Sequence, residues 1–184
     1  MDYKEALNGL LGLTDLERVS GKLPRHRRYN LNRVEHLLHL LNNPHLGLPT
    51  VHISGTKGKG SVAALTSSVL DAGGYHPGLF TSPHLHSFRE RIQRDNQPIT
   101  EGDFVAVFNK IWHLVEKIGQ DDKYGEITTF ELLTAMAFVY FRLKNTDINI
   151  IEVGMGGRLD ATNLVQPSVS VITPISLDHT RILG

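Results

Sequence analysis

The sequence contains no cysteine, so disulfide bonds are excluded, and a chain without thiols is typical of a reducing compartment. It also lacks an excess of either charge. Lys plus Arg and Asp plus Glu each number 19, so no overall field attracts the chain to nucleic acid or to an anionic membrane. No apolar run approaches the roughly 18 residues of a membrane span, and the first residues carry no apolar signal-peptide core. We therefore expect a cytoplasmic protein with no nucleic-acid or membrane partner.

The sequence does alternate short β-branched runs with longer amphipathic stretches, and its 184 residues suffice for one domain with a real core. Strands separated by helices, with strands apolar on both faces, predict an α/β fold with a mainly parallel sheet flanked by helices. Helices are expected over residues 2–19, 31–41, 100–118 and 129–144, a strand–helix unit over 50–73, and further strands over 78–81, 148–153 and 169–173.

Ligands of such sheets bind beyond the carboxyl ends of the strands. Four loops follow the expected strands there, at residues 54–61, 81–91, 152–163 and 173–180. These loops also hold most of the chemically reactive side chains of the sequence.

The first of these loops reads GTKGKGS and lies between an apolar run and a helical stretch. Strand, glycine-rich loop and helix form the geometry of a P-loop, in which backbone N–H groups, a helix start and a lysine surround phosphate. The loop departs from the GxxxxGK[ST] pattern, because Lys59 is followed by Gly60. A plain flexible turn is the alternative, but three glycines and a serine within seven residues favour phosphate binding.

Glu152 ends an otherwise apolar run, where an unpaired carboxylate would be costly to bury. One explanation is an ion pair with Arg158. The preferred one is a magnesium ligand, because an acidic residue beside a phosphate loop supplies the hard oxygen that a magnesium-bound nucleotide needs. The following GMGGRL has Leu159 in its sixth position, so it is not a dinucleotide-binding fingerprint. His84 and His86 lack a third ligand at zinc spacing.

Five segments occur in order from about residue 31 onward: HISGTKGKGS, LFTSPHLHSFRERI, TTFELLTAMAF, EVGMGGRLDATN and ITPISLDHTRILG. Together they resemble the N-terminal part of folylpolyglutamate synthases and of the related bifunctional dihydrofolate synthases, in the Mur ligase superfamily. The resemblance implies an ATP-dependent ligase. ATP phosphorylates a carboxylate of a folate or of dihydropteroate, and the amine of L-glutamate displaces phosphate from the acyl phosphate to form an amide.

The resemblance also implies roles for individual residues. Lys59, Glu152 and His179 are the catalytic candidates, and Mg²⁺ would be held by Ser82, Glu152 and His179. The ATP phosphates would be held by Thr56, Lys57, Gly58, Lys59, Gly60 and Ser61. The pterin of the acceptor would be lined by Thr128, Thr129, Phe130, Glu131, Leu159, Asp160 and Ala161, with Phe130 stacking and Asp160 hydrogen-bonding to the ring.

By the same resemblance, residues 1–184 are the N-terminal part of the ATP-binding domain. The family's EKAGI segment, its adenine site and its glutamate-binding C-terminal domain would lie beyond Gly184, so the chain alone is expected to be an inactive piece. The alternative is a stand-alone nucleotide- or folate-binding module without ligase activity. A peptidoglycan-type Mur ligase is disfavoured by TSPHL and RLDATN, which lie where the acceptor is chosen. The basic segment from Arg25 to Arg28 is more basic than the resemblance implies.

Overall fold

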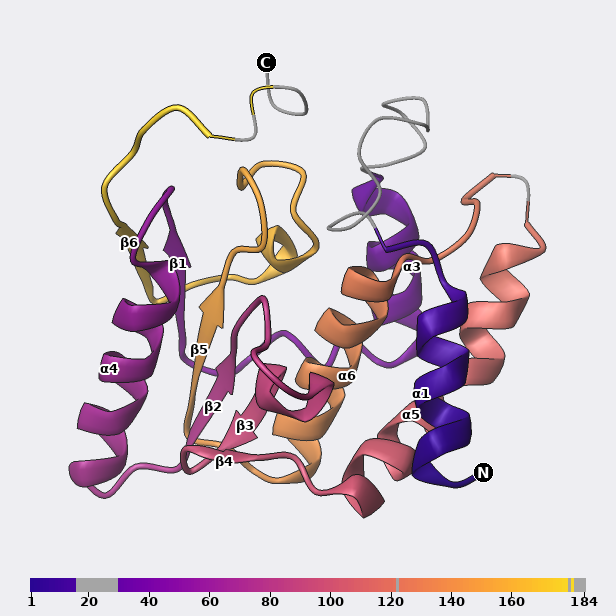
Figure 1. Cartoon of the computed structure of the whole chain (residues 1–184), viewed down its shortest axis with the longest axis horizontal. Coiled ribbons are helices and arrows are strands. Elements are labelled where there is room, and N and C mark those ends of the chain that lie inside the picture. The colour runs from indigo at the N-terminus through magenta and orange to yellow at the C-terminus, as the bar shows by residue number, and fades with distance from the viewer. Residues whose placement is uncertain (16–29, 122, 179, 181–184) are drawn as a thin grey trace.

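The computed structural model describes residues 1–15, 30–121, 123–178 and 180 (Figure 1). Its helices are α1 (Tyr3–Gly12), α3 (Leu31–Leu40), α4 (Lys59–Ala72), α5 (Glu101–Gly119) and α6 (Thr129–Leu143), with short 3₁₀ turns η1 (Phe88–Arg91) and η2 (Ala161–Leu164). Its strands are β1 (Thr50–Ser54), β2 (Pro77–Phe80), β3 (Ile92–Arg94), β4 (Gln97–Pro98), β5 (Ile148–Glu152) and β6 (Val169–Ile172).

These strands form one six-stranded sheet in the order β4-β3-β2-β5-β1-β6. The four strands expected from the sequence, β2, β5, β1 and β6, run parallel, which confirms the α/β fold with a mainly parallel sheet. The added strands β3 and β4 are antiparallel and extend the β2 edge. The sequence analysis did not predict them, because three and two residues are too few for alternation to be visible.

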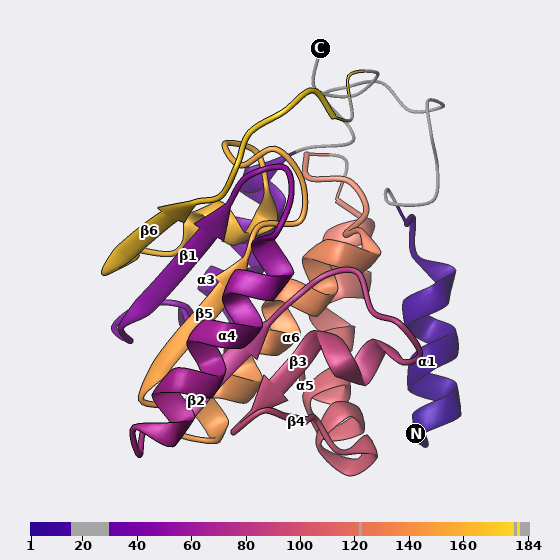
Figure 2. The ribbon, with the colours of Figure 1, turned by 60° about the vertical axis from the view of Figure 1, so that its left-hand side comes forward.

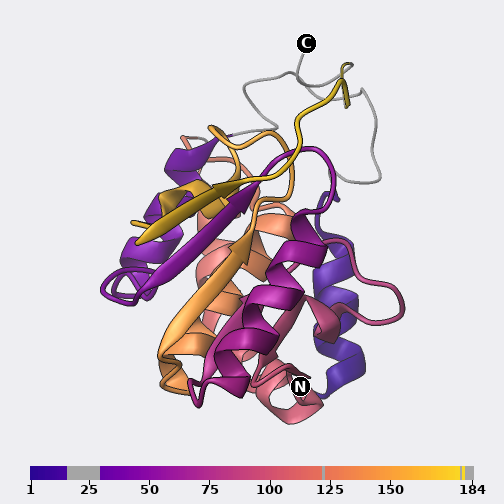
Figure 3. The same ribbon diagram turned by 90° about the vertical axis from the view of Figure 1, so that its left-hand side faces the viewer.

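The two faces of the sheet are covered unequally. Helices α1, α3, α5 and α6 build the large core on one face, and α4 alone packs on the other (Figures 2 and 3). Neighbouring residues of β5 divide between the faces: Ile150 belongs to the α4 core and Ile151 to the larger one. Both are fully buried, as expected for a parallel strand apolar on both sides.

Helix boundaries follow local capping. Thr100 caps α5 and Thr128 caps α6, and every residue of α6 from Glu131 to Phe141 is buried. The helix expected over 2–19 is confirmed for α1 but does not continue through residues 13–15, and residues 16–19 lie outside the described residues. α1 begins after the Asp2 capping box and ends at Gly12, where Leu13 is extended. Glycine and the following Thr14 and Asp15 favour a helix end over its continuation.

The strand register brings the loops of interest to one edge of the sheet, at the top of Figure 1. Ile53 pairs with Glu152, Phe80 with Ile151 and Ser54 with Ile172. The chain therefore leaves β1, β2 and β6 close to the end of β5, where Glu152 stands. No helix among the described residues is long and apolar enough to cross a membrane.

Candidate active site

The loop between β1 and α4 is shaped by two glycines with positive φ. Gly55 has φ +132°, and a Cβ at this position would lie 2.0 Å from Thr173 Oγ1 and 2.8 Å from the Thr173 carbonyl oxygen. Gly58 has φ +85° and is the N-cap of α4. Only glycine adopts both conformations without strain, and only glycine allows Thr173, the residue after β6, to approach the loop so closely.

The same loop is tied to the segment after β6 through Thr56. Its N–H donates to the Pro174 carbonyl at 3.1 Å, its hydroxyl donates to the Ser176 carbonyl at 3.0 Å, and the Ser176 N–H donates back to that hydroxyl at 3.0 Å. Two loops that are about 120 residues apart in the chain are thereby held side by side.

The start of α4 is open to an anion. Gly58 has no side chain to cap the helix, and no described side chain accepts a hydrogen bond from the first-turn N–H groups. Lys57, Gly58 and Ser61 are exposed, whereas Lys59 and Gly60 are partly buried. Unpaired N–H groups at a helix start, together with a lysine, form an anion-binding site. The six residues predicted to hold phosphate are thus contiguous around this helix start.

Glu152 lies directly beside this loop. A Cβ on Gly60 would be 3.5 Å from both carboxylate oxygens of Glu152, and Glu152 itself is only 3% exposed. Burial raises the pKa of Glu152, while the hydrogen bond from the Ser82 N–H and the charges of Lys59 and Arg91 oppose that rise. Among the described residues no ion pair joins Glu152 to Arg158, which is exposed, so the alternative explanation of Glu152 finds no support.

Ser82, in the loop that follows β2, also contacts Glu152. Its N–H donates to Glu152 Oε2 at 2.9 Å, and its hydroxyl has no hydrogen-bond partner among the described residues. One carboxylate, one free hydroxyl and the phosphates of a nucleotide are a donor set that suits Mg²⁺, which usually takes only one or two protein ligands and completes its shell with phosphate and water. The third predicted ligand, His179, lies outside the described residues, and the described part holds no cluster of three His, Cys, Asp or Glu.

The predicted pterin residues come from two segments that meet. Phe130 stands in the first turn of α6, its ring is 5.8 Å from that of Phe80, and a Cβ on Gly154 would lie 2.6 Å from Phe130 Cζ and 3.1 Å from Asp160 Oδ2. The start of α6 and the loop after β5 therefore touch. Leu159 is 46% exposed on this loop, whereas Ala161 is buried.

Several of these residues also serve the fold. Thr128 and Thr129 are buried at the start of α6, and Thr128 caps the helix. Glu131 is buried against Arg33, whose Nε donates to both of its carboxylate oxygens at 2.8 and 2.9 Å, and it also accepts from the Thr128 N–H at 2.8 Å. Glu131 therefore joins α3 to α6 before any ligand is considered.

Asp160 is buried and shapes its own loop. Its carboxylate accepts from the Met155 N–H at 2.9 Å, from the Thr162 N–H at 3.0 Å and from the Thr162 hydroxyl at 2.6 Å. Burial raises the pKa of Asp160, and these hydrogen bonds, with another from the Gly154 N–H, oppose the rise. Its role toward the pterin ring stays a prediction.

The sequence analysis missed Arg91, which is 3% exposed and lies near Glu152. Its Nε donates to His84 Nδ1 at 2.9 Å, and its guanidinium lies 5.4 Å from the centre of the Phe88 ring. The Nδ1 atom of His84 is thus used in a hydrogen bond with Arg91. The SFRE sequence, an S-x-x-E capping box, was the available signal that this charged run begins an ordered turn.

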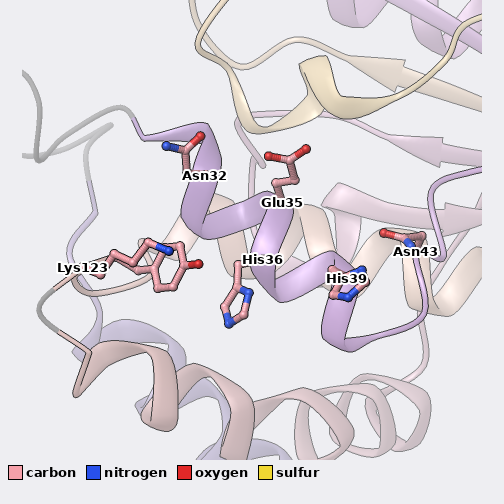
Figure 4. A pocket seen from close by; sticks show the side chains of 7 residues that line it. Asn32, Glu35, His36, His39, Asn43 and Lys123 are labelled. Atoms are coloured by element: carbon pink, nitrogen blue, oxygen red, sulfur yellow. The ribbon is translucent and has the colours of Figure 1, made fainter.

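A separate cavity of about 480 Å³ lies on α3 (Figure 4). His36 stacks on Tyr124 with ring centres 4.5 Å apart, and Lys123 Nζ lies 4.8 Å from the Tyr124 ring centre. The cavity presents both signs of charge, and none of its lining residues comes from the carboxyl edge of the sheet. Its lining residues are Asn32, Glu35, His36, His39, Asn43, Lys123 and Tyr124.

No family model matches the chain, but individual proteins do. The folylpolyglutamate synthase of Lacticaseibacillus casei is 41% identical over 152 residues, which cover 83% of this chain and 36% of that protein. The dihydrofolate synthase/folylpolyglutamate synthase of Bacillus subtilis is 40% identical over 167 residues, 90% of this chain and 39% of that protein. The chain therefore spans less than two-fifths of the length of these curated relatives.

A solved structure of a folylpolyglutamate synthase has the same fold as this chain. The complex of a folylpolyglutamate synthase with AMPPCP and folate superposes on this chain with a TM-score of 0.88 at 36% identity, over 100% of this chain and 43% of that one. The sequence matches and the structural superposition both extend over most of this chain. The chain belongs to the folylpolyglutamate synthase family.

Proposed function

We propose that the full-length protein containing this chain is an ATP-dependent ligase that joins L-glutamate to a folate, to dihydropteroate, or to both. The observation that carries the proposal is the junction of the glycine loop with Glu152: an anion-binding helix start, a partly buried Lys59 and a buried carboxylate within reach of Gly60. The relative solved as a complex with AMPPCP and folate supports ATP and a folate as the two ligands.

In the proposed mechanism the N–H groups of residues 59–61 bind the phosphates of ATP, and Lys59 neutralises charge on the transferring phosphoryl group. The acceptor carboxylate attacks the γ-phosphorus, ADP leaves, and an acyl phosphate is formed. The amine of glutamate then attacks the acyl carbon, inorganic phosphate leaves with the bridging oxygen, and the amine loses a proton. The residues of the chain contribute mainly orientation and charge neutralisation.

Mg²⁺ forms part of the proposal through Ser82 and Glu152, and through His179 on the resemblance alone. When bound there, the ion would supply further neutralisation of phosphate charge. The Ser82 N–H bond holds the Glu152 carboxylate in place, and Gly60 leaves room beside it. Phe130 and the loop of Leu159, Asp160 and Ala161 are proposed to receive the pterin.

The division of labour along the chain is also a proposal. Residues 1–184 would supply the phosphate loop and much of the acceptor site, and the glutamate site would come from a C-terminal domain. The lengths of the relatives support this division, since this chain corresponds to 36–39% of them. A cytoplasmic location likewise stays a prediction, supported by the lack of cysteine.

The test is a side-by-side assay of the full-length protein with ATP, Mg²⁺ and L-glutamate, with dihydropteroate in one reaction and tetrahydrofolate in the other. ATP-dependent formation of a glutamylated product from either acceptor supports the ligase. Nucleotide or folate binding without product from either acceptor would favour the alternative, a binding module.

A further inference from the structure

A buried polar chain links the loop after β5 to the middle of the sheet. The Thr162 hydroxyl lies 2.6 Å from Asp160 Oδ1 and 2.9 Å from His52 Nε2. Thr162 is fully buried in η2, and His52 is partly buried on β1, 110 residues away in sequence. The sequence analysis assigned no role to either residue.

The direction of these hydrogen bonds follows from the donors around Asp160. Two N–H groups of its own loop, from Met155 and Thr162, and the Thr162 hydroxyl all point at the carboxylate. The Thr162 hydroxyl therefore donates its hydrogen bond to Asp160. Its oxygen accepts a hydrogen bond from His52, whose Nε2 is the protonated ring nitrogen. Burial lowers the pKa of His52, which keeps the imidazole neutral and suited to this role.

This chain of hydrogen bonds fixes the loop against a rigid element. β1 is paired on both sides, with β5 and with β6, so His52 cannot move independently of the sheet. The loop that it holds carries Leu159 and Asp160 and packs through Gly154 on Phe130. Glu152, by contrast, is held by the sheet itself, since the next residue, Val153, donates its N–H to the Ile53 carbonyl at 2.9 Å.

We propose that Thr162 and His52 are positioning residues for the acceptor site: they hold Asp160 and its loop in the geometry that receives the pterin-bearing substrate. The proposal rests on the proposed function. The residues proposed to hold Mg²⁺ and phosphate are anchored separately from this loop. Loss of the Thr162 hydroxyl should therefore weaken recognition of the acceptor and leave recognition of ATP and Mg²⁺ unchanged. By analogy with the groups that orient metal ligands, whose removal costs about 10- to 100-fold in affinity or activity, we expect an effect of similar size on the acceptor.

The experiment compares Thr162→Val, Thr162→Ser and Thr146→Val in the full-length protein, with KM measured for the acceptor and for ATP. Thr146 is the matched control, because it is 3% exposed and its hydroxyl lies 2.8 Å from Asn149 Oδ1, at the opposite end of β5. We expect Thr162→Val to raise the acceptor KM about tenfold or more. Thr162→Ser keeps the hydroxyl and should restore nearly normal values. The KM for ATP should stay within about twofold of wild type in every variant.

The proposal is overturned if Thr162→Val changes the acceptor KM no more than Thr146→Val does, or if it raises the KM for ATP equally. If Thr162→Val does not fold, the comparison of His52→Gln with His52→Met decides. Glutamine keeps an N–H donor near the position of Nε2, so only methionine should raise the acceptor KM. A wild-type protein that forms no product with either acceptor would instead refute the proposed function.

Discussion

At the end of β5, the carboxylate of Glu152 is only 3% exposed and accepts a hydrogen bond from the Ser82 N–H of a neighbouring loop. Lys59 and Arg91 lower the pKa of Glu152, but burial outweighs them. Burying a carboxylate is costly, and a bound cation offsets that cost. This is the physical reason to place Mg²⁺ beside Glu152 rather than at another carboxylate of the sheet edge.

The substitution Glu152→Gln keeps the shape of the side chain and removes its charge. We expect the Mg²⁺ dependence of the full-length enzyme to move to much higher concentration, by about tenfold or more, because a carboxylate oxygen is a far better ligand than an amide. A magnesium titration of the rate measures this shift. A curve that superimposes on that of the wild type would remove Glu152 from the metal site.

Lys59 makes no ion pair with a described residue, so its charge is available to phosphate. Lys59→Ala should lower kcat by at least about 100-fold, as the loss of a charge-stabilising group typically does. The matched control is Lys110→Ala, an exposed lysine on α5, which should turn over at the wild-type rate. Near wild-type turnover by Lys59→Ala itself would contradict the assignment.

His52 gives the protein a dependence of stability on pH. Burial lowers its pKa from 6.5, so the unfolded chain binds a proton at higher pH than the folded one. The stability that neutral His52 provides is present above pH 6.5 and is lost as the pH falls through the lowered pKa of the folded state. His45 shares this behaviour but is unchanged in a His52→Gln variant. When the pH is lowered from about 7.5 to about 5.5, the Tm of the wild type should therefore fall more than the Tm of His52→Gln. Equal falls in the two proteins would contradict this.

At the scale of elements, the join of β1 to α4 depends on backbone that only glycine adopts readily. Gly58 and Gly74 both have φ +85°, and a Cβ at either position would meet no atom within 4 Å. An alanine at either site therefore costs only the strain of a left-handed residue, about 1–2 kcal/mol. The two glycines differ in place: Gly58 begins α4 at the phosphate loop, and Gly74 follows its far end.

Gly58→Ala and Gly74→Ala should thus lower Tm by similar amounts, while only Gly58→Ala weakens nucleotide binding. Calorimetric titration of the full-length variants with AMPPCP and Mg²⁺ separates the two effects. Equal nucleotide affinity in both variants would show that the helix start at Gly58 does not hold phosphate.

Elements with strong local signals were predictable from the sequence. The apolar runs indicated the parallel strands, and the helices expected from residues 100 and 129 begin close to the observed caps Thr100 and Thr128. Pairings between distant residues were not predictable. Glu131 was expected only as a pterin residue, yet its partner Arg33 is 98 residues away. A buried ion pair across two helices leaves no spacing in the sequence that periodicity could detect.

At the scale of the whole molecule, the sheet topology determines where the candidate site lies. β1, β2, β5 and β6 are parallel, so the loops that follow them converge at one edge, and the sequence was sufficient to predict which loops these are. The sequence could not predict which contacts hold these loops together. Thr56 ties the phosphate loop to the segment after β6, and Gly154 packs on Phe130, through contacts that only the folded chain brings together.

We propose that, in the full-length protein, this edge of the sheet is where ATP activates a carboxylate of the acceptor. The most direct measurement uses the full-length protein and an acceptor whose reacting carboxylate carries ¹⁸O at both oxygens. If an acyl phosphate forms, the oxygen that bridges carbon and phosphorus leaves with phosphate, so mass spectrometry should find one ¹⁸O in the inorganic phosphate for each amide formed. Glutamylated product accompanied by unlabelled phosphate would contradict an acyl-phosphate mechanism.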